Sequence, residues 1–246
     1  MNNTMNQYKS SADLKALAKE RLFGKYGTAV GATVIVALIV EFVTFFSTIF
    51  IDPRTLAGTI LNFIICFVIT VLSGLFTSGT AYLYLKLSCN KQVTVSDVFY
   101  GFQLFPNKAV LIQLYLSIWV DLIGLLPLTI LSYFVRKNPQ SSILMLAFSL
   151  TAIVCGVIIV FVTLIYSQAF YLLHDFPDYS VKELLSLSRK LMKGSKGRLF
   201  YMLVSFIPLM LLSLLSCGIA LLWLVPYMNA TQTEFFLDLM KNTEIS

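Results

Sequence analysis

Residues 143–173 read ILMLAFSLTAIVCGVIIVFVTLIYSQAFYLL, a run without a single charged side chain. A helix of about 20 apolar residues crosses the hydrocarbon core of a bilayer, and this run is long enough to do so. Three further predominantly apolar runs cover residues 29–51, 56–85 and 109–135. Together the four runs predict an integral membrane protein built from helices.

The last apolar region, residues 199–228, is too long for one span and barely long enough for two. Small residues at 216–218, Ser-Cys-Gly, lie in its middle and suit a tight turn. We therefore expect a hairpin of two spans, 199–215 and 219–235, with the second helix kinked at Pro226. A re-entrant hairpin that does not cross stays open as the alternative, because hydropathy separates the two cases poorly.

The composition supports this interpretation. Hydrophobic residues make up 58% of the chain and charged residues only 12%, and the mean hydropathy is +0.83. These values predict an all-α, polytopic transmembrane helical bundle of about six spans. We divide the chain into a cytoplasmic amphipathic N-terminal segment, residues 1–26, and a single helical membrane domain, residues 27–246.

Lysine and arginine fall mainly on one side of the predicted bilayer. Six spans place both termini on the same side, together with the loop regions 86–108 and 174–198. That side holds 15 of the 18 basic residues, and the opposite side holds only Arg54, Arg136 and Lys137. Cytoplasmic loops carry an excess of lysine and arginine. We therefore expect a multi-pass protein of the cell (cytoplasmic) membrane with both termini in the cytoplasm.

The cytoplasmic side carries three amphipathic pieces. Residues 12–25 have apolar positions at helical spacing, which predicts an amphipathic helix. A short helix follows Thr94, and either Thr94 or Ser96 can cap it. The third helix begins after Ser180, where Ser180 and Glu183 fit a capping box, and Gly194 is placed to end it. These pieces are the polar part of the molecule that a partner could reach.

A basic cluster lies at the end of the third amphipathic helix, just before the fifth span. It could bind anionic lipids or an acidic membrane-protein partner, since each basic residue near an anionic surface contributes about 1 kcal/mol. The alternative, which the positive-inside bias favours, is that the charges only hold the loop in the cytoplasm. We expect no nucleic-acid partner, because topology accounts for the net charge and no recognition motif accompanies it. The cluster consists of Arg189, Lys190, Lys193, Lys196 and Arg198.

Glu41 and Asp121 are the only acidic residues deep within predicted spans. Each lies twelve residues from the inner end of its span, about 18 Å along the helix, and no basic residue lies at that depth. An ionised pair there is costly, so we expect at least one of the two to be protonated. The pair predicts either a proton- or cation-handling site or structural acids hydrogen-bonded to neighbours such as Asn62 or Ser117.

Motifs of soluble enzymes are missing from the sequence. It has no HExxH, no GxSxG and no phosphate-binding loop, and His174 is its single histidine. His174 lies near Asp175 and Asp178, a group typical of the polar end of a span rather than of a metal site. We therefore expect no enzyme activity, no catalytic residues, no cofactor and no metal.

Several stretches resemble a family of bacterial integral membrane proteins classed as domain of unknown function nine-seven-five. The resemblance covers nearly the whole chain and implies a six-helix membrane protein without implying a reaction. The stretches that carry it are LKALAKERL (14–22), VSDVF (95–99), SRKLMKG (188–194), LWL (222–224), PYM (226–228) and TEFF (233–236). Where the family usually has Gly-Trp after Ser-Phe-Ile, this chain has Pro208-Leu209, which could bend the fifth span differently.

The C-terminal half is also loosely similar to membrane domains fused to bacterial glycerophosphodiesterases, whose catalytic carboxylate and histidine set is absent here. The leading functional hypothesis is therefore a non-catalytic accessory or regulatory component that acts through membrane or protein partners, for example in envelope homeostasis or peptide resistance. The alternative is a small-solute or proton-coupled transporter or channel that uses Glu41 and Asp121. The sequence gives no indication of an oligomeric state.

Overall fold

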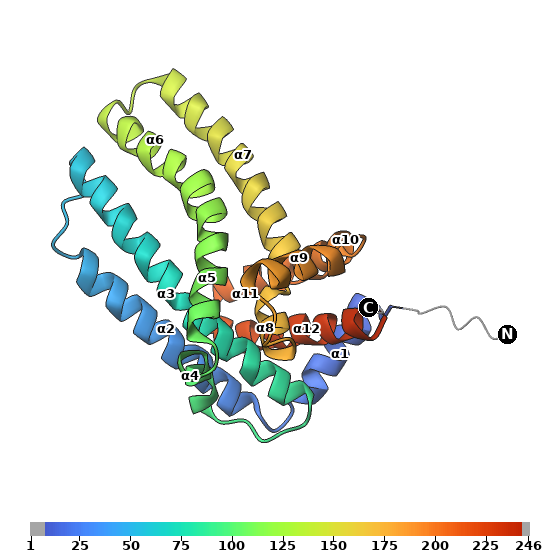
Figure 1. The fold of residues 1–246 in the computed structure, drawn as a ribbon. Helices are drawn as coiled ribbons and strands as arrows, with labels where there is room; N and C mark the ends of the chain where they lie inside the picture. Colours follow the sequence, from blue (N-terminus) through green and yellow to red (C-terminus); the bar gives the residue numbers. More distant parts are fainter. Residues whose placement is uncertain (1–7, 243–246) are drawn as a thin grey trace.

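The computed structural model describes residues 8–242, which are helical almost throughout and contain no strand. The first seven residues of the predicted segment 1–26 and the last four of the domain 27–246 lie outside the described residues. The helices, shown in Figure 1, are α1 (Ser11–Leu22), α2 (Tyr26–Thr48), α3 (Leu56–Ser88), η1 (Val95–Phe99), α4 (Tyr100–Gln103), α5 (Pro106–Ser117), η2 (Ile118–Leu125), α6 (Leu126–Lys137), α7 (Ser142–Tyr166), α8 (Ala169–Asp175), α9 (Val181–Leu191), α10 (Lys196–Val204), α11 (Ile207–Leu215) and α12 (Leu221–Asn242).

Within residues 8–242, five helical segments are long and apolar enough to cross a membrane, which confirms the all-α membrane bundle. They correspond to the first five predicted spans, with ends shifted by a few residues. The segments are Tyr26–Thr48, Leu56–Ser88, Pro106–Lys137, Ser142–Asp175 and Lys196–Leu215. The third consists of α5, η2 and α6 in series, the fourth of α7 and α8, and the fifth of α10 and α11.

The sixth predicted span, 219–235, is not among these five segments. The helix there, α12, runs through Pro226 to Asn242, and its second half contains the buried acids Glu234 and Asp238. Only its first turn, residues 221–223, is apolar and exposed. That α12 crosses the bilayer therefore remains a prediction.

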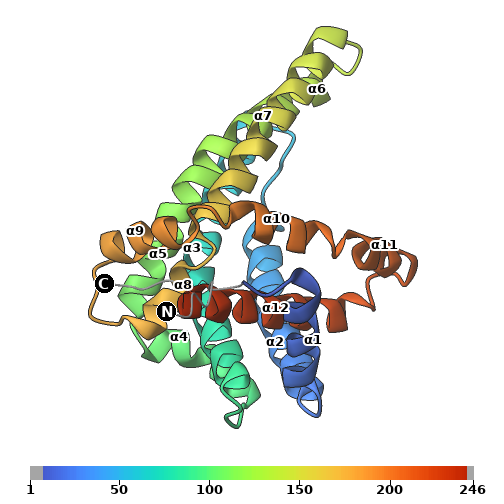
Figure 2. The same ribbon diagram turned by 90° about the vertical axis from the view of Figure 1, so that its right-hand side faces the viewer.

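The long helices form hairpins that diverge from a common base. Helices α2 and α3 form one hairpin and α6 and α7 another (Figure 1), while α10, α11 and the start of α12 project to one side as a third (Figure 2). The third hairpin turns at the predicted position, because Cys217 and Gly218 both have left-handed backbones, with φ of 52° and 85°. The predicted turn at 216–218 is thus confirmed.

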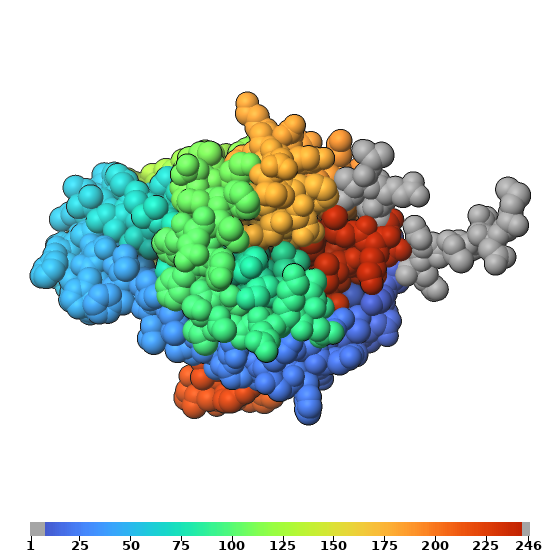
Figure 3. Space-filling model, turned by 60° about the horizontal axis from the view of Figure 1, so that its bottom comes forward, coloured from blue at the N-terminus to red at the C-terminus, as the bar shows by residue number. Residues whose placement is uncertain are grey.

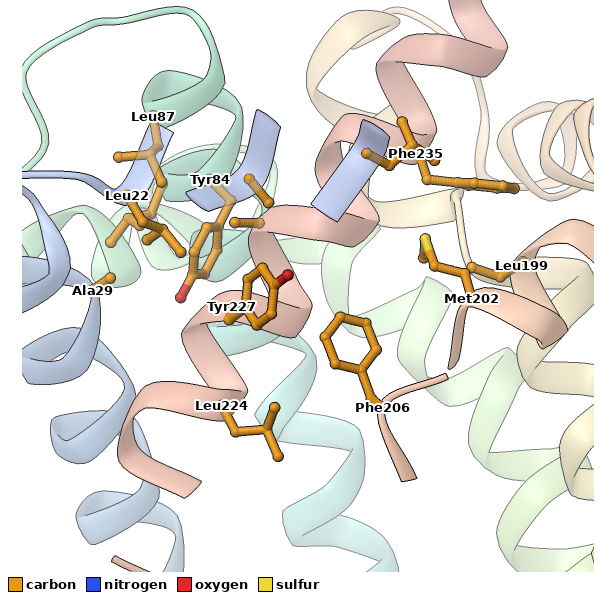
Figure 4. Packing of buried hydrophobic residues seen from close by; sticks show 14 of the residues in the cluster. Leu22, Ala29, Tyr84, Leu87, Leu199, Met202, Phe206, Leu224, Tyr227 and Phe235 are labelled. Carbon is orange, nitrogen blue, oxygen red and sulfur yellow. The ribbon is translucent and has the colours of Figure 1, made fainter. Parts of the chain in front are cut away.

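Helix α12 is the centre of the common base. It packs against α1, α2 and α3, and Phe206, just before α11, meets Tyr227 edge-on at 5.2 Å between ring centroids (Figure 4). Two ion pairs join it to other helices: Arg198 to Asp238 at 2.8 Å and Arg21 to Glu234 at 3.6 Å. A helix with apolar and charged partners on several sides holds the base together.

The predicted amphipathic helices are confirmed. In α1 the apolar positions Leu14, Ala18 and Leu22 are buried, so this helix shares the core of the membrane domain. The capping box of α9 is formed, with Ser180 and Glu183 each accepting a bond from the other's backbone N–H, and Gly194 follows with φ of 88°. On one face of the molecule α1, α5, the α8–α9 region and the end of α12 lie side by side (Figure 3).

Close packing fixes η1 and α4 against α3. A Cβ atom at Gly79 would overlap the Val98 carbonyl oxygen, and one at Gly101 would overlap the Leu75 carbonyl oxygen. Only glycine allows two backbones to approach so closely. The short helices after the predicted cap at Thr94, whose N–H donates to the Asp97 carboxylate at 2.9 Å, therefore lie directly on the second span.

A candidate polar site in the helical bundle

The third span changes its helical geometry at its midpoint. Segment η2 is a π-helix, in which the Leu126 N–H donates to the Asp121 carbonyl five residues earlier. Pro127 follows in the first turn of α6. Proline has no N–H to donate and crowds the preceding turn, so the wider π turn relieves the conflict. Such π segments occur frequently at functional sites, and this one carries Asp121.

Asp121 is buried but incompletely bonded. Its side chain is 7% exposed, and its Oδ2 atom has no hydrogen-bond partner among residues 8–242. Ser117, one turn earlier, is 1% exposed and its hydroxyl also lacks a partner within the described chain. Buried polar groups in membrane spans are costly when unpaired, and they commonly mark ligand sites.

Two cavities meet at Asp121. One has a volume of about 310 Å³ and the other about 440 Å³, and both have Thr70 and Asp121 in their walls. No lysine or arginine lines either cavity. The other polar residues of the smaller cavity are Thr77, Gln113, Ser117, Thr163, Tyr166, Ser167 and Gln232, and those of the larger are Asn62, Cys66, Thr129 and Ser132.

Both cavities lie along α3. From Asn62 to Thr77 this helix advances about 22 Å at 1.5 Å per residue, which is most of the thickness of the hydrocarbon core. Carboxylate, amide and hydroxyl oxygens can bind a cation or pass a proton, and no basic side chain in the walls competes with them. The arrangement is suited to a small cation or a proton.

The model of a protein family described as protein of unknown function (DUF975) matches residues 1–243. The chain belongs to this family. The match confirms the resemblance carried by the stretches between residues 14 and 236. No curated protein and no solved structure gives a significant match. The function of this DUF975 protein is therefore argued from its own geometry.

The structure separates the two predicted intramembrane acids. Asn62 and Asp121 line the same cavity, whereas Glu41 is exposed on α2 beside Leu38 and Phe42, which are 64% and 62% exposed. Helix α3 lies between α2 and the third span (Figure 1). Glu41 therefore faces the surroundings of the bundle rather than Asp121, so the two acids do not form one site in this structure.

Two members of the predicted basic cluster bond to the rest of the fold. Arg198 donates to Asp238 at 2.8 Å and lies 4.2 Å from the Tyr8 ring centroid. Arg189 donates to the Tyr166 hydroxyl at 2.7 Å. Arg189, Lys190 and Lys193 are exposed, and Lys196 and Arg198 are half-buried. Whether the five residues bind lipid or a partner together stays a prediction.

The group around His174 has a packing role. The His174 Nε2 atom lies 2.8 Å from the Ser78 carbonyl oxygen, which joins α8 to α3. Within residues 8–242 there is no group of three or more histidine, cysteine, aspartate or glutamate residues that could hold a metal ion. His174 thus connects two spans of the DUF975 bundle.

Sequence reasoning overlooked most of the cavity walls. Thr70 lines both cavities, Gln232 lines the smaller one, and Thr129 and Ser132 line the larger one. One signal was available in α3, where Asn62, Cys66 and Thr70 recur every four residues on one helical face. The residues from α6 and α12 carry no comparable local signal, because tertiary packing alone brings them to the site.

Proposed function

We propose that this DUF975 protein is a non-catalytic protein of the cell membrane that binds small cations or protons at Asp121 and conducts them through the bundle. The supporting observation is the position of Asp121, whose unpartnered Oδ2 lies where two cavities meet, each with several hydroxyl or amide side chains in a largely apolar wall. An ionised carboxylate is costly at that depth. Asp121 is therefore either protonated or neutralised by a bound cation, and exchange between the two states is the elementary step of the proposal.

The sequence alone favours an accessory role over transport, whereas the cavities favour transport. Composition and missing motifs favour an accessory component, since a pathway cannot be seen in a sequence. The cavities give the transport hypothesis a physical basis that the accessory hypothesis lacks. Glu41 is no longer part of it, because its side chain is exposed on α2.

The test is a flux assay with Glu41 as the matched control. Proteoliposomes that enclose a dye sensitive to protons, sodium or potassium are given a gradient of the same ion. We expect the wild-type protein to dissipate at least one gradient faster than protein-free liposomes, Asp121→Asn to fall to the protein-free rate and Glu41→Gln to match the wild type. A wild type that dissipates none of the three, or an Asp121→Asn variant as fast as the wild type, contradicts the proposal.

A second candidate function is the accessory role, which the exposed Lys190 and Lys193 at the end of α9 support. Both side chains can reach an acidic membrane-protein partner, and neither takes part in the ion pairs of the described residues. Affinity purification from native membranes in mild detergent should then recover a stoichiometric partner that Lys190→Gln/Lys193→Gln loses. Recovery of the same partner by this variant argues against the role.

We also propose that both termini lie in the cytoplasm and that the α11–α12 hairpin crosses the bilayer. The native cysteines provide the test, because Cys89 and Cys217 are exposed at opposite ends of the proposed topology. With Cys66 and Cys155 changed to serine, a membrane-impermeant maleimide should label Cys217 in intact cells and Cys89 only after permeabilisation. Labelling of Cys217 only after permeabilisation indicates a re-entrant hairpin instead.

A further inference from the structure

A groove separate from the two cavities lies between the third span and α9. Its volume is about 480 Å³. The third span contributes an almost wholly apolar wall, and α9 contributes an apolar base with two cationic side chains. The wall consists of Leu111, Leu114, Tyr115 and Ile118, and the residues from α9 are Val181, Lys182, Leu185, Ser186 and Arg189.

Hydrogen bonds orient Arg189, one of the two cations of the groove. Arg189 donates from Nη2 to the Tyr166 hydroxyl at 2.7 Å, and that hydroxyl lies 3.1 Å from the hydroxyl of Tyr115. The Ser188 hydroxyl donates to the Ile165 carbonyl at 3.0 Å, which holds α9 against α7. The guanidinium is thus oriented before any ligand arrives, and little conformational entropy is lost on binding.

The charges in the groove are available to a ligand. The ion pairs found in residues 8–242 include neither Lys182 nor Arg189. Glu183, the nearest acidic residue in the chain, accepts bonds from the backbone N–H and hydroxyl of Ser180 at 2.7 and 2.8 Å. Lys182 and Arg189 lie seven residues apart, two helical turns, and therefore on the same side of α9.

We infer that this groove binds an anionic phospholipid. The groove begins beside α5, near one end of the third span, and continues along an amphipathic helix, which is the position of a bilayer interface. An acyl chain fits the leucine and isoleucine wall, and a phosphodiester fits between an ammonium and a guanidinium, whose planar donors match phosphate oxygens. A soluble anion would gain nothing from the apolar wall, so both parts of the groove select a lipid.

The experiment counts bound lipids by native mass spectrometry. Delipidated full-length protein in mild detergent is titrated with dioleoyl phosphatidylglycerol and, separately, with dioleoyl phosphatidylcholine. We expect one phosphatidylglycerol to bind in preference to phosphatidylcholine. Loss of two charges in Lys182→Gln/Arg189→Gln should weaken phosphatidylglycerol binding about thirty-fold, and Lys182→Gln alone, which leaves the tyrosine contacts intact, about fivefold.

The matched control is Lys91→Gln/Lys241→Gln, which removes two exposed lysines that do not line the groove. It should bind phosphatidylglycerol like the wild type. Equal binding of both lipids by the wild type, equal weakening in the control, or unchanged binding in Lys182→Gln overturns the inference. Displacement of phosphatidylglycerol by inorganic phosphate also overturns it, because the site would then recognise phosphate without a lipid.

Discussion

At the scale of single residues, Asp121 and Asp238 are two buried carboxylates in opposite situations. Asp238 accepts bonds from Arg198 at 2.8 Å, from the Lys9 backbone N–H at 3.3 Å and from Asn242 at 3.4 Å. Asp121 keeps an unpartnered oxygen in the walls of two cavities. A fully bonded acid stabilises a fold, whereas a partly bonded one can still take a ligand.

Asp238→Ala should destabilise the protein strongly. It leaves Arg198 without its carboxylate, and breaking a largely buried ion pair from one side costs about 3 kcal/mol. Thermal unfolding in detergent measures the effect, and Glu20→Ala, which removes an exposed acid on α1, serves as the control. An Asp238→Ala variant as stable as Glu20→Ala would show that the α10–α12 ion pair contributes little.

The depth of an intramembrane residue could be predicted from the sequence, but whether its side chain faces the bundle or the lipid could not. Asp121 was predicted from its depth and Asn62 as a neighbour that could bond to it, and the structure places both in one cavity wall. Glu41 was selected by the same criterion and is exposed. Its helix, α2, is apolar on all sides, so no polar stripe indicates which side faces the bundle.

At the scale of elements, local rules predicted helix starts well. The capping box at Ser180 and the cap at Thr94 are both formed, because a cap depends only on residues three positions apart. The π-helix η2 was not predicted. Its cause, Pro127, is visible in the sequence, but proline can equally produce a simple kink, and packing decides between the two.

The cap of α9 should make this helix sensitive to acid. Hydrogen bonds from the Ser180 backbone and hydroxyl hold the pKa of Glu183 below its ordinary value of 4.5. A lowered pKa stabilises the folded helix fully above the ordinary value, and that contribution is lost as the pH falls through the lowered value. Hydrogen exchange of the first turn of α9, corrected for intrinsic rates, should therefore accelerate below pH 4.5.

Glu183→Gln keeps an acceptor without a titrating charge, so its corrected exchange should be independent of pH over the same range. Ser180→Ala removes the cap at every pH and should cost about 1 kcal/mol of local stability. Exchange in the wild type that does not change between neutral and acidic pH would contradict the role given to Glu183.

The contact between α3 and η1 should not tolerate a methyl group. In Gly79→Ala the new Cβ would overlap the Val98 carbonyl oxygen, so the backbones must separate, at a cost of about 1–3 kcal/mol. Gly156→Ala is the matched control, because no atom lies within 4 Å of its added Cβ. Melting temperatures in detergent should fall for Gly79→Ala and stay level or rise for Gly156→Ala, and a reversed order would contradict this packing.

At the scale of the whole molecule, hairpins diverge from a base centred on α12 (Figure 2). Span positions could be predicted, since hydropathy reports which segments enter the bilayer. The arrangement of the hairpins could not be predicted, because lipid tails are as apolar as leucine and give no signal about which helices pair.

Tyr166 connects two sites in this arrangement, since its hydroxyl accepts a hydrogen bond from Arg189 of the groove and the residue lines the 310 Å³ cavity.

The central claim is that a polar path passes Asp121 through the bundle, and cysteine accessibility tests it most directly. Two cysteines are introduced one at a time into a variant whose four native cysteines are changed to serine. Thr70→Cys lies in the walls of both cavities. Ile64→Cys lies on the same helix but lines neither cavity, and Ile64 is 50% exposed. Each variant is treated in proteoliposomes with a small, water-soluble, cationic methanethiosulfonate reagent.

We predict that Thr70→Cys reacts, that Ile64→Cys does not because it faces lipid, and that adding Asp121→Asn slows the reaction at position 70 by removing the attracting carboxylate. If Thr70→Cys is unreactive, or no faster than Ile64→Cys, the path does not exist and Asp121 is a structural acid.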